Sequence, residues 1–163
     1  ASVSVEPPMF VDVVNVTSAA DMADVVKSKA AEQDIIIMTA AVADFCPSHP
    51  ADEKIKKNDS SYESVIELER TEDILSYLGA HKAKGQLICG FSMETQNMLE
   101  NSKAKLAKKN ADMIVANNLK VAGAGFGTDT NVVTLITADD CTELEIMDKS
   151  CVAAKIMDRL LQM

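Results

Sequence analysis

The sequence predicts an α/β fold in which helices cover both faces of a mostly parallel sheet. Strand-like and helix-like segments alternate over most of the chain, which is typical of parallel strands joined by crossover helices. The runs Asp34–Thr39 and Gln86–Phe91 contain uninterrupted apolar stretches, as in strands buried on both faces. Near the end, two strand-like runs have the short spacing of an antiparallel hairpin. We therefore expect a doubly wound, Rossmann-like sheet with a C-terminal hairpin and a ligand site at the carboxyl ends of its strands.

The first half contains further elements around these strands. Phe10–Val16 is rich in valine and predicts a short strand. Ser18 and Asp21 have the spacing of a capping box, so a helix should begin there and reach about Ala31. Cys46–Ser61 holds two prolines and shows no periodicity, which predicts an irregular segment.

The remaining elements follow the same alternation. Val65–Glu69 alternates apolar and charged residues and predicts a half-exposed strand. Thr71 can cap a helix over about Glu72–Lys82. Ala111–Ala116 predicts another strand, and the hairpin should consist of Asn131–Thr137 and Cys141–Met147. A final helix should begin near Ser150 and turn four residues toward the core: Val152, Ile156, Met157 and Leu160.

Composition limits the function classes. A chain of 163 residues with 47% apolar residues fits one domain, and no apolar run approaches the ~20 residues needed to cross a bilayer. The net charge of −9 argues against binding to nucleic acid or to anionic membranes. The four cysteines are far apart and form no CxxC pair, which disfavours a metal or disulfide framework and predicts a cytoplasmic location.

Two strand ends hold candidate ligand contacts. Asp34–Thr39 leads into Ala40 and further small residues that would let a ligand lie close to the backbone, and Asp44 could accept hydrogen bonds from the amine of a base. A tight turn with a solvated or helix-capping aspartate explains this stretch about equally well. Phe91, after the second buried strand, could stack on a base, although a core phenylalanine is the commoner arrangement.

The helix expected between residue 95 or 96 and about residue 109 contains a lysine pair. Lys105 and Lys109 are one turn apart and share a stripe, while Lys108 points outward. Two ammonium groups on one stripe repel each other unless an anion lies between them, and a phosphate chain would satisfy both. Salt bridges to nearby acids are the alternative explanation.

Several short motifs occur in a fixed order along essentially the whole chain: Ala40-Ala41-Val42-Ala43-Asp44-Phe45, Lys54-Ile55-Lys56-Lys57, Glu72-Asp73-Ile74-Leu75, Gly90-Phe91, Lys105-Leu106 with Lys109, Asp112–Asn117 and Phe126-Gly127-x-Asp129-x-Asn131. In order and spacing they resemble the phosphopantothenate–cysteine ligase (phosphopantothenoylcysteine synthetase) family of the bacterial type. That family joins 4′-phosphopantothenate to L-cysteine in coenzyme A biosynthesis, using CTP in most bacteria and ATP in eukaryotes.

The resemblance implies a reaction and its participants. The substrate carboxylate would attack the α-phosphorus of CTP to give an acyl-cytidylate and pyrophosphate, and the amine of cysteine would then displace CMP. CTP is the expected co-substrate, and Mg²⁺ is the expected cofactor, held by the nucleotide phosphates rather than by protein ligands. The expected macromolecular partners are a second copy of the chain, as a homodimer, and a fused or associated phosphopantothenoylcysteine decarboxylase.

The resemblance also implies residue roles. Lys54 is the expected catalytic residue, because it would close over the triphosphate from a loop, while Lys105 and Lys109 would hold the triphosphate from the helix. Nucleotide contacts are expected from twelve residues: Met38, Thr39, Ala40, Asp44, Lys54, Glu72, Asp73, Ile74, Leu75, Phe91, Lys105 and Lys109.

One departure from the family pattern concerns the start of the chain. The family's domain begins with a strand, a glycine-containing turn and an asparagine-bearing stretch, whereas Ala1–Pro8 resembles the segment after the second strand. We therefore expect residues 1–163 to form a single nucleotide-binding ligase domain without its N-terminal part, and this chain to be inactive.

Two other function classes stay open. An NAD(P)-type dinucleotide-binding oxidoreductase shares the fold class, although the sequence contains no GxGxxG motif. In a non-catalytic dimerisation module, the hairpin would form the interface and the lysines would be solvated.

Overall fold

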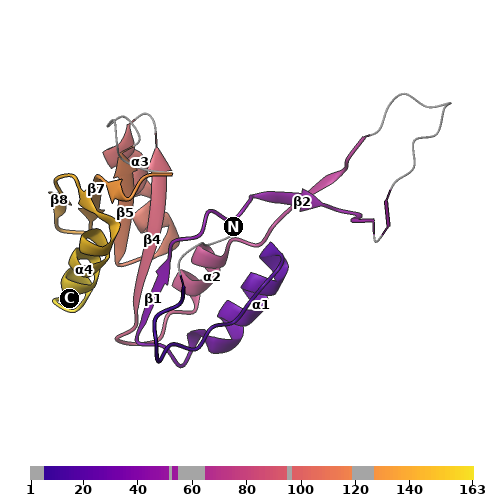
Figure 1. The fold of residues 1–163 in the computed structure, drawn as a ribbon, viewed down its shortest axis with the longest axis horizontal. Coiled ribbons are helices and arrows are strands. Elements are labelled where there is room, and N and C mark those ends of the chain that lie inside the picture. The colour runs from indigo at the N-terminus through magenta and orange to yellow at the C-terminus, as the bar shows by residue number, and fades with distance from the viewer. Residues whose placement is uncertain (1–5, 52, 55–64, 95–96, 119–126) are drawn as a thin grey trace.

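The structure is a computed structural model that describes residues 6–51, 53–54, 65–94, 97–118 and 127–163 (Figure 1). Its central sheet has the strand order β1-β4-β5-β7-β8, with these bounds: β1 Ile35–Met38, β4 Leu87–Glu94, β5 Met113–Asn118, β7 Val133–Ile136 and β8 Cys141–Glu143. Strands β1, β4 and β5 pair in parallel, β7 pairs antiparallel with β5, and β8 pairs antiparallel with β7. The predicted mostly parallel sheet with a C-terminal hairpin is therefore confirmed.

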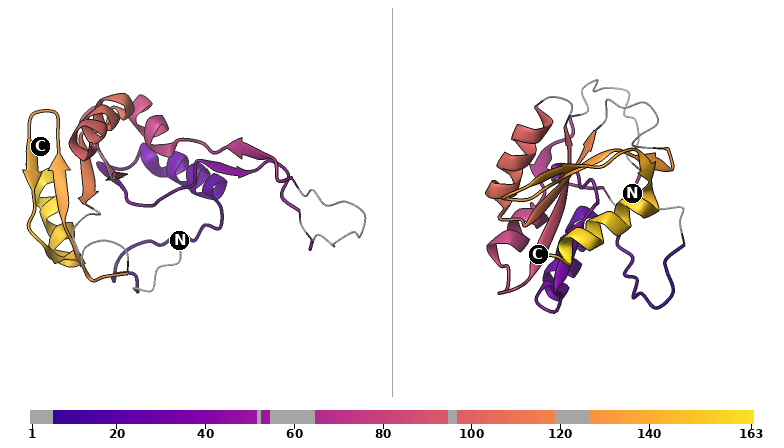
Figure 2. Two further views of the ribbon diagram at one scale, coloured as in Figure 1. Left: turned by 90° about the horizontal axis from the view of Figure 1, so that it is seen from above. Right: turned by 90° about the vertical axis from the view of Figure 1, so that its left-hand side faces the viewer.

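Helices cover both faces of this sheet. Helices α1 (Ala19–Ala30), α2 (Ile74–Ala80) and α3 (Met98–Lys109) pack on one face, and α4 (Lys149–Leu160) packs on the other (Figure 2). Val152, Ile156 and Leu160 of α4 are buried, as predicted, but Met157 is 39% exposed. The prediction for Met157 was wrong because the buried stripe of α4 repeats every four residues, and Met157 lies about 100° away from Ile156.

The edge of the sheet differs from the expectation. The residues of β1 pack alternately against the core clusters on the two faces of the sheet, as predicted for this strand, but all four are only half-buried. The reason is position, since β1 is the first strand in the sheet order and pairs with β4 alone in the described part of the chain. Phe10–Val16 lies outside every described strand and its valines are exposed, so its predicted strand is also absent.

The helix starts are explained by local hydrogen bonds. The capping box of α1 is confirmed, because Ser18 Oγ accepts from Asp21 N at 3.0 Å and Asp21 Oδ2 accepts from Ser18 N at 2.9 Å. Hydrogen bonds from Thr17 and Ser18 lower the pKa of Asp21 to about 2. Helix α2 is capped by Asp73, whose Oδ1 accepts from Ser76 N at 2.9 Å, and not by Thr71 as predicted.

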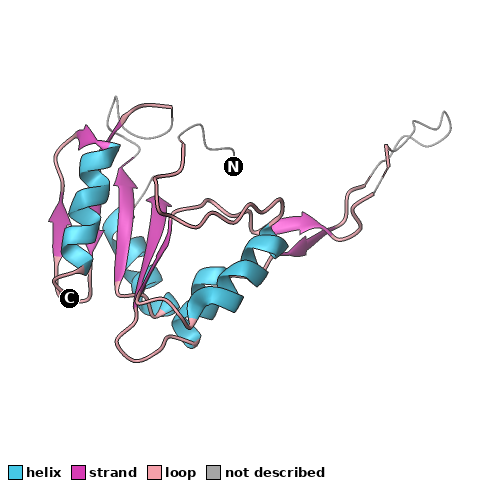
Figure 3. Ribbon diagram, turned by 60° about the horizontal axis from the view of Figure 1, so that its bottom comes forward, coloured by secondary structure: helices cyan, strands magenta, loops and turns pink. Residues whose placement is uncertain are grey.

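Thr71 instead lies at the base of a two-stranded ribbon. Strands β2 (Phe45–Pro47) and β3 (Leu68–Arg70) pair antiparallel and extend away from the central sheet (Figures 1 and 3). Thr71 N donates to Asp44 O at 3.0 Å, which ties the base of the ribbon to the start of α2. The prediction that Cys46–Ser61 is irregular was therefore wrong at its first two residues, and residues 52 and 55–61 lie outside the described ones.

The hairpin region contains a second small pair. Strands β6 (Thr130–Asn131) and β9 (Met147–Asp148) pair antiparallel, so the single strand predicted over Cys141–Met147 is divided between β8 and β9. No helix in the described part of the chain is long and apolar enough to cross a membrane.

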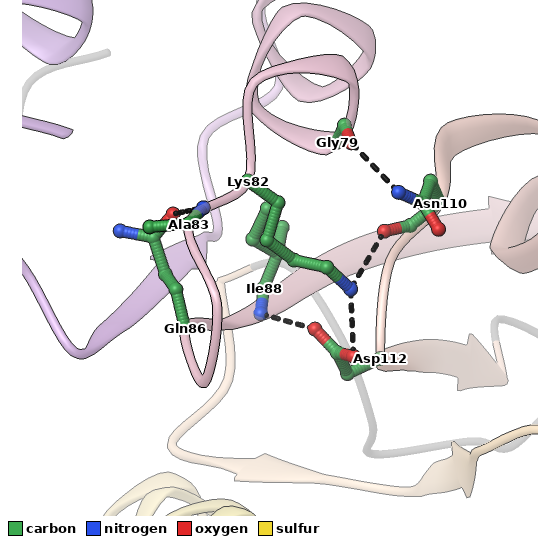
Figure 4. A network of polar contacts seen from close by, with 7 residues as sticks. All are labelled: Gly79, Lys82, Ala83, Gln86, Ile88, Asn110 and Asp112. Atoms are coloured by element: carbon green, nitrogen blue, oxygen red, sulfur yellow. Dashed lines mark hydrogen bonds and ion pairs between the residues drawn. The ribbon is translucent and has the colours of Figure 1, made fainter. Parts of the chain in front are cut away.

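A polar network joins the strands to the helices at the end opposite the cavity described below (Figure 4). Asp112 accepts from Lys82 Nζ at 2.9 Å and from Ile88 N at 2.7 Å, which links the start of β5 to β4 and to the segment that follows α2. Asn110 Nδ2 donates to Gly79 O at 2.7 Å. These contacts fix α2 and α3 relative to the sheet, and both helices contribute residues to the cavity.

Candidate active site

A cavity of about 360 Å³ lies beside the carboxyl end of β1, where a doubly wound sheet is expected to bind its ligand. Its walls come from the segment after β1, the end of β3, the first turn of α2, the middle of β4 and the last turns of α3. The lining residues are Met38, Ala40, Val42, Ala43, Asp44, Arg70, Thr71, Glu72, Asp73, Ile74, Leu75, Phe91, Lys105 and Lys109.

Ten of the twelve residues expected to contact a nucleotide line this cavity, and Thr39 and Lys54 do not. Successive side chains of an extended segment alternate in direction, so Met38 and Ala40 can face the cavity while Thr39 points elsewhere. Lys54 is exposed and lies beside residues 55–64, which are outside the described part of the chain. The catalytic role expected for Lys54 stays a prediction.

Four lining residues were absent from the expected set: Val42, Ala43, Arg70 and Thr71. Val42 and Ala43 belong to the small-residue motif and could have been included on that ground. Arg70 is the last residue of the exposed strand β3 and Thr71 follows it, and only the pairing of β2 with β3 places them at the cavity.

The two lysines of α3 are turned toward the cavity and have polar partners. Lys105 Nζ donates to Phe91 O at 2.7 Å. Lys109 Nζ forms an ion pair with Asp73 and donates to Ser76 Oγ at 2.9 Å. The salt-bridge alternative for the lysine pair is thus realised for Lys109, and Lys108 is exposed, as expected for the outward face.

Two opposing effects act on the pKa of the Asp73 carboxyl group. Partial burial raises its pKa, but hydrogen bonds from Lys109 and Ser76 and the nearby positive charge lower it, and the net pKa lies below the ordinary value of 3.8. Asp73 is therefore ionised at neutral pH, and it holds Lys109 at the cavity wall.

Glu72 is held from the side of α1. Lys27 Nζ forms an ion pair with Glu72 Oε2 and lies 5.0 Å from the ring centroid of Tyr77, which stacks on His81 with centroids 4.1 Å apart. The hydrogen bond to Glu72 raises the pKa of Lys27 above its ordinary value. These contacts fasten the turn that carries Glu72 and Asp73 to α1.

Gly90, the residue before Phe91, allows close packing of α2 on β4 beside the cavity. A Cβ added to Gly90 would lie 2.6 Å from Leu75 Cδ2 and 3.1 Å from Ile114 Cδ1. The absence of a side chain therefore lets Leu75 of α2 pack directly against β4, which brings the first turn of α2 next to Phe91. This close approach explains why glycine precedes Phe91 in the motif.

The cavity walls carry charges of both signs, so a ligand with both anionic groups and hydrogen-bond donors could find partners there. Arg70, Lys105 and Lys109 supply positive charge, and Asp44 offers an acceptor. The described residues include no group of three or more His, Cys, Asp or Glu side chains arranged to hold a metal ion. Cys89 does not line the cavity but lies in the core between the sheet and α4, where burial raises its thiol pKa to about 12.

Comparisons with a family model and with curated proteins identify similar proteins. The family model described as DNA/pantothenate metabolism flavoprotein C-terminal domain matches residues 1–163. The chain is 46% identical to the coenzyme A biosynthesis bifunctional protein CoaBC of Bacillus subtilis, over 95% of this chain and 38% of that protein. It is 45% identical to a cysteine/cysteine sulfinic acid decarboxylase of an unidentified prokaryote, over 93% of this chain and 42% of that protein.

A solved structure of similar fold comes from the same kind of protein as the first of these relatives. The crystal structure of the C-terminal domain of CoaBC superimposes with a TM-score of 0.78 at 40% identity, over 99% of this chain and 72% of that chain. The chain spans about two fifths of the length of the two curated relatives.

Proposed function

Because the chain belongs to the DNA/pantothenate metabolism flavoprotein C-terminal domain family, as its motifs indicated, we propose that its cavity is the nucleotide site of a phosphopantothenate–cysteine ligase. The observation that supports this function best is the cavity itself. Ten expected nucleotide contacts, drawn from four separate stretches of the sequence, line one cavity at the carboxyl end of a parallel strand. The proposed reaction joins 4′-phosphopantothenate to L-cysteine in coenzyme A biosynthesis.

The nucleotide is proposed to be CTP, with its phosphates at α3 and its base near Asp44. Lys109 would exchange the Asp73 carboxylate for a phosphate oxygen, and Lys105 would donate from the same stripe of the helix. Mg²⁺, held by the phosphates, would neutralise part of their charge. Aligning the carboxylate with the α-phosphorus would then depend on positioning rather than on covalent help from a side chain.

The wider setting is part of the same proposal. The relatives include a bifunctional protein and a decarboxylase, so we expect this chain to act together with a decarboxylase. A homodimer and a cytoplasmic location stay predictions.

Thermal unfolding with CTP, ATP and NADH, each with Mg²⁺, tests the function. A ligand that binds only the folded state raises the unfolding midpoint in proportion to the logarithm of its concentration above Kd. We expect CTP to raise the midpoint more than ATP, and NADH to leave it unchanged. A shift with NADH alone would favour a dinucleotide-dependent oxidoreductase, and no shift with any nucleotide would favour a dimerisation module.

The role of Asp44 can be tested separately. Asp44→Asn should weaken CTP binding by roughly 1–3 kcal/mol, because an amide is a weaker acceptor than a carboxylate for the cytosine amine. UTP, which has a carbonyl in place of that amine, should bind the parent chain more weakly than CTP. Isothermal titration of both nucleotides measures these differences.

Asp139→Asn is the matched control. Asp139 is exposed in the turn between β7 and β8, and its substitution makes the same change in net charge. Unchanged CTP affinity in the Asp44 variant, or an equal loss in both variants, would remove Asp44 from the base pocket.

A further inference from the structure

We propose that Arg70 is an additional anion-binding residue of this site, and that its guanidinium binds a substrate phosphate from the β2–β3 ribbon while the lysines of α3 bind from the helix. The proposal rests on the proposed function, because both of the expected substrates, the nucleotide and 4′-phosphopantothenate, contain phosphate groups. It adds a residue that the family motifs did not include.

The first argument is the balance of charges at the cavity. Three cations and three carboxylates line it: Arg70, Lys105 and Lys109, and Asp44, Glu72 and Asp73. Glu72 pairs with Lys27 outside the cavity lining, and Asp73 pairs with Lys109. Among the described residues, no carboxylate lies within ion-pair distance of the Arg70 guanidinium. Its positive charge is therefore left for a ligand.

The second argument is the way in which the guanidinium is held. Arg70 lies directly opposite Phe45 in the register of β2 and β3, and its Cζ atom is 5.4 Å from the centroid of the Phe45 ring. A cation over an aromatic face is attracted by the ring, but the ring uses none of the guanidinium N–H groups. The contact with Phe45 thus restricts the position of the guanidinium and leaves its donors open.

The third argument is chemical fit. A guanidinium presents its donors in a planar fork that matches the oxygens of a phosphate, whereas the ammonium groups of Lys105 and Lys109 act as point charges. Arg70 comes from β3 and the lysines come from α3, so an anion that contacts both would be held between two separate elements. The phosphate could belong to the nucleotide or to 4′-phosphopantothenate, and the experiment must distinguish these sources.

The test measures binding of three probes to the full chain by isothermal titration: inorganic tripolyphosphate, CTP with Mg²⁺, and 4′-phosphopantothenate. Arg70→Gln should weaken at least one probe by about tenfold or more, since a charge-assisted hydrogen bond contributes on that scale. Arg70→Lys should recover part of the loss, because it keeps the charge without the fork. Arg159→Gln, on α4 and paired with Asp140, is the control and should change none of the three.

The pattern of losses identifies the phosphate. Losses for tripolyphosphate and CTP assign Arg70 to the triphosphate, and a loss for 4′-phosphopantothenate alone assigns it to the acyl substrate. Parent-like affinity for all three probes in a folded Arg70→Gln variant would overturn the role of Arg70 and leave the proposed function standing. If the parent chain binds tripolyphosphate through Arg70 but binds neither CTP in this test nor ATP in the thermal unfolding test, the proposed function is overturned and the anion site is kept.

Discussion

Changing Lys105 or Lys109 to methionine should weaken CTP binding by at least about tenfold in each variant and leave CMP binding nearly unchanged. Each lysine is proposed to donate a charge-assisted hydrogen bond to the β- or γ-phosphate, which contributes roughly 1.5–3 kcal/mol, and CMP lacks both phosphates. Both side chains are half-buried and line the cavity, so a bound phosphate would be within reach of them. Isothermal titration of CTP and CMP against each variant measures the difference.

Lys108→Met is the matched control, because Lys108 is exposed on the outward face of the same helix and makes the same change in net charge. It should alter neither affinity. Equal losses for CTP and CMP, or a Lys108 effect as large as the other two, would mean that the lysines supply only a diffuse positive field, and the phosphate assignment would fail.

The Lys109 variant should also be less stable than the parent chain in the absence of ligand. From sequence, Lys105 and Lys109 were expected to repel each other, but in the structure Lys109 is paired with Asp73 and bonded to Ser76. Lys109→Met should therefore destabilise the chain at neutral pH. The pKa of Asp73 in the folded state lies below 3.8. The stabilisation from the Lys109–Asp73 ion pair is therefore fully present above pH 3.8, and it is lost as the pH falls through the folded-state pKa of Asp73. Urea unfolding at neutral pH and at strongly acidic pH measures the change.

Most of the sheet and of the cavity could be predicted because the sequence patterns that indicate them are local. The apolar runs that became β1 and β4, and the small residues after β1, are legible within a few positions of the sequence. A doubly wound sheet then places its ligand at the carboxyl ends of those strands. The same reasoning explains why Ala40, Asp44 and Phe91 were expected at a ligand site and line the cavity.

The features that could not be predicted depend on pairing between distant residues. Arg70 reaches the cavity because β3 pairs with β2, and the intervening sequence gives no sign of this register. Phe10–Val16 has the composition of a strand, but a strand also needs a hydrogen-bonding partner, and none is present in the part of the chain described. The exposure of Met157 likewise depends on how narrowly α4 contacts the sheet.

The largest loss of stability among the predicted variants is expected from Gly79→Ala, at the crossing of α2 and α3. A Cβ at Gly79 would overlap the carbonyl oxygen of Lys109, and it would also lie 2.9 Å from the Lys109 carbonyl carbon and 3.2 Å from Asn110 Cβ. The nearest of these atoms are backbone, so no rotation of a side chain can relieve the clash. The helices would have to separate, which would also stretch the hydrogen bond from Asn110 to Gly79 O.

We expect Gly79→Ala to lower the free energy of unfolding by at least about 2 kcal/mol, even though alanine favours the helix by about 1 kcal/mol relative to glycine. CTP affinity should fall as well, because Lys109 and Asp73 lie on the two helices that move apart. Gly85→Ala is the control, since Gly85 has a φ of +83° but no atom within 4 Å of an added Cβ, so its cost should be limited to about 1–2 kcal/mol of backbone strain with no change in CTP affinity. Urea unfolding gives the free energies and titration gives the affinities. If Gly79→Ala were as stable as the parent, α2 and α3 could separate at little cost, and their close crossing would not be what positions Lys109 at the cavity.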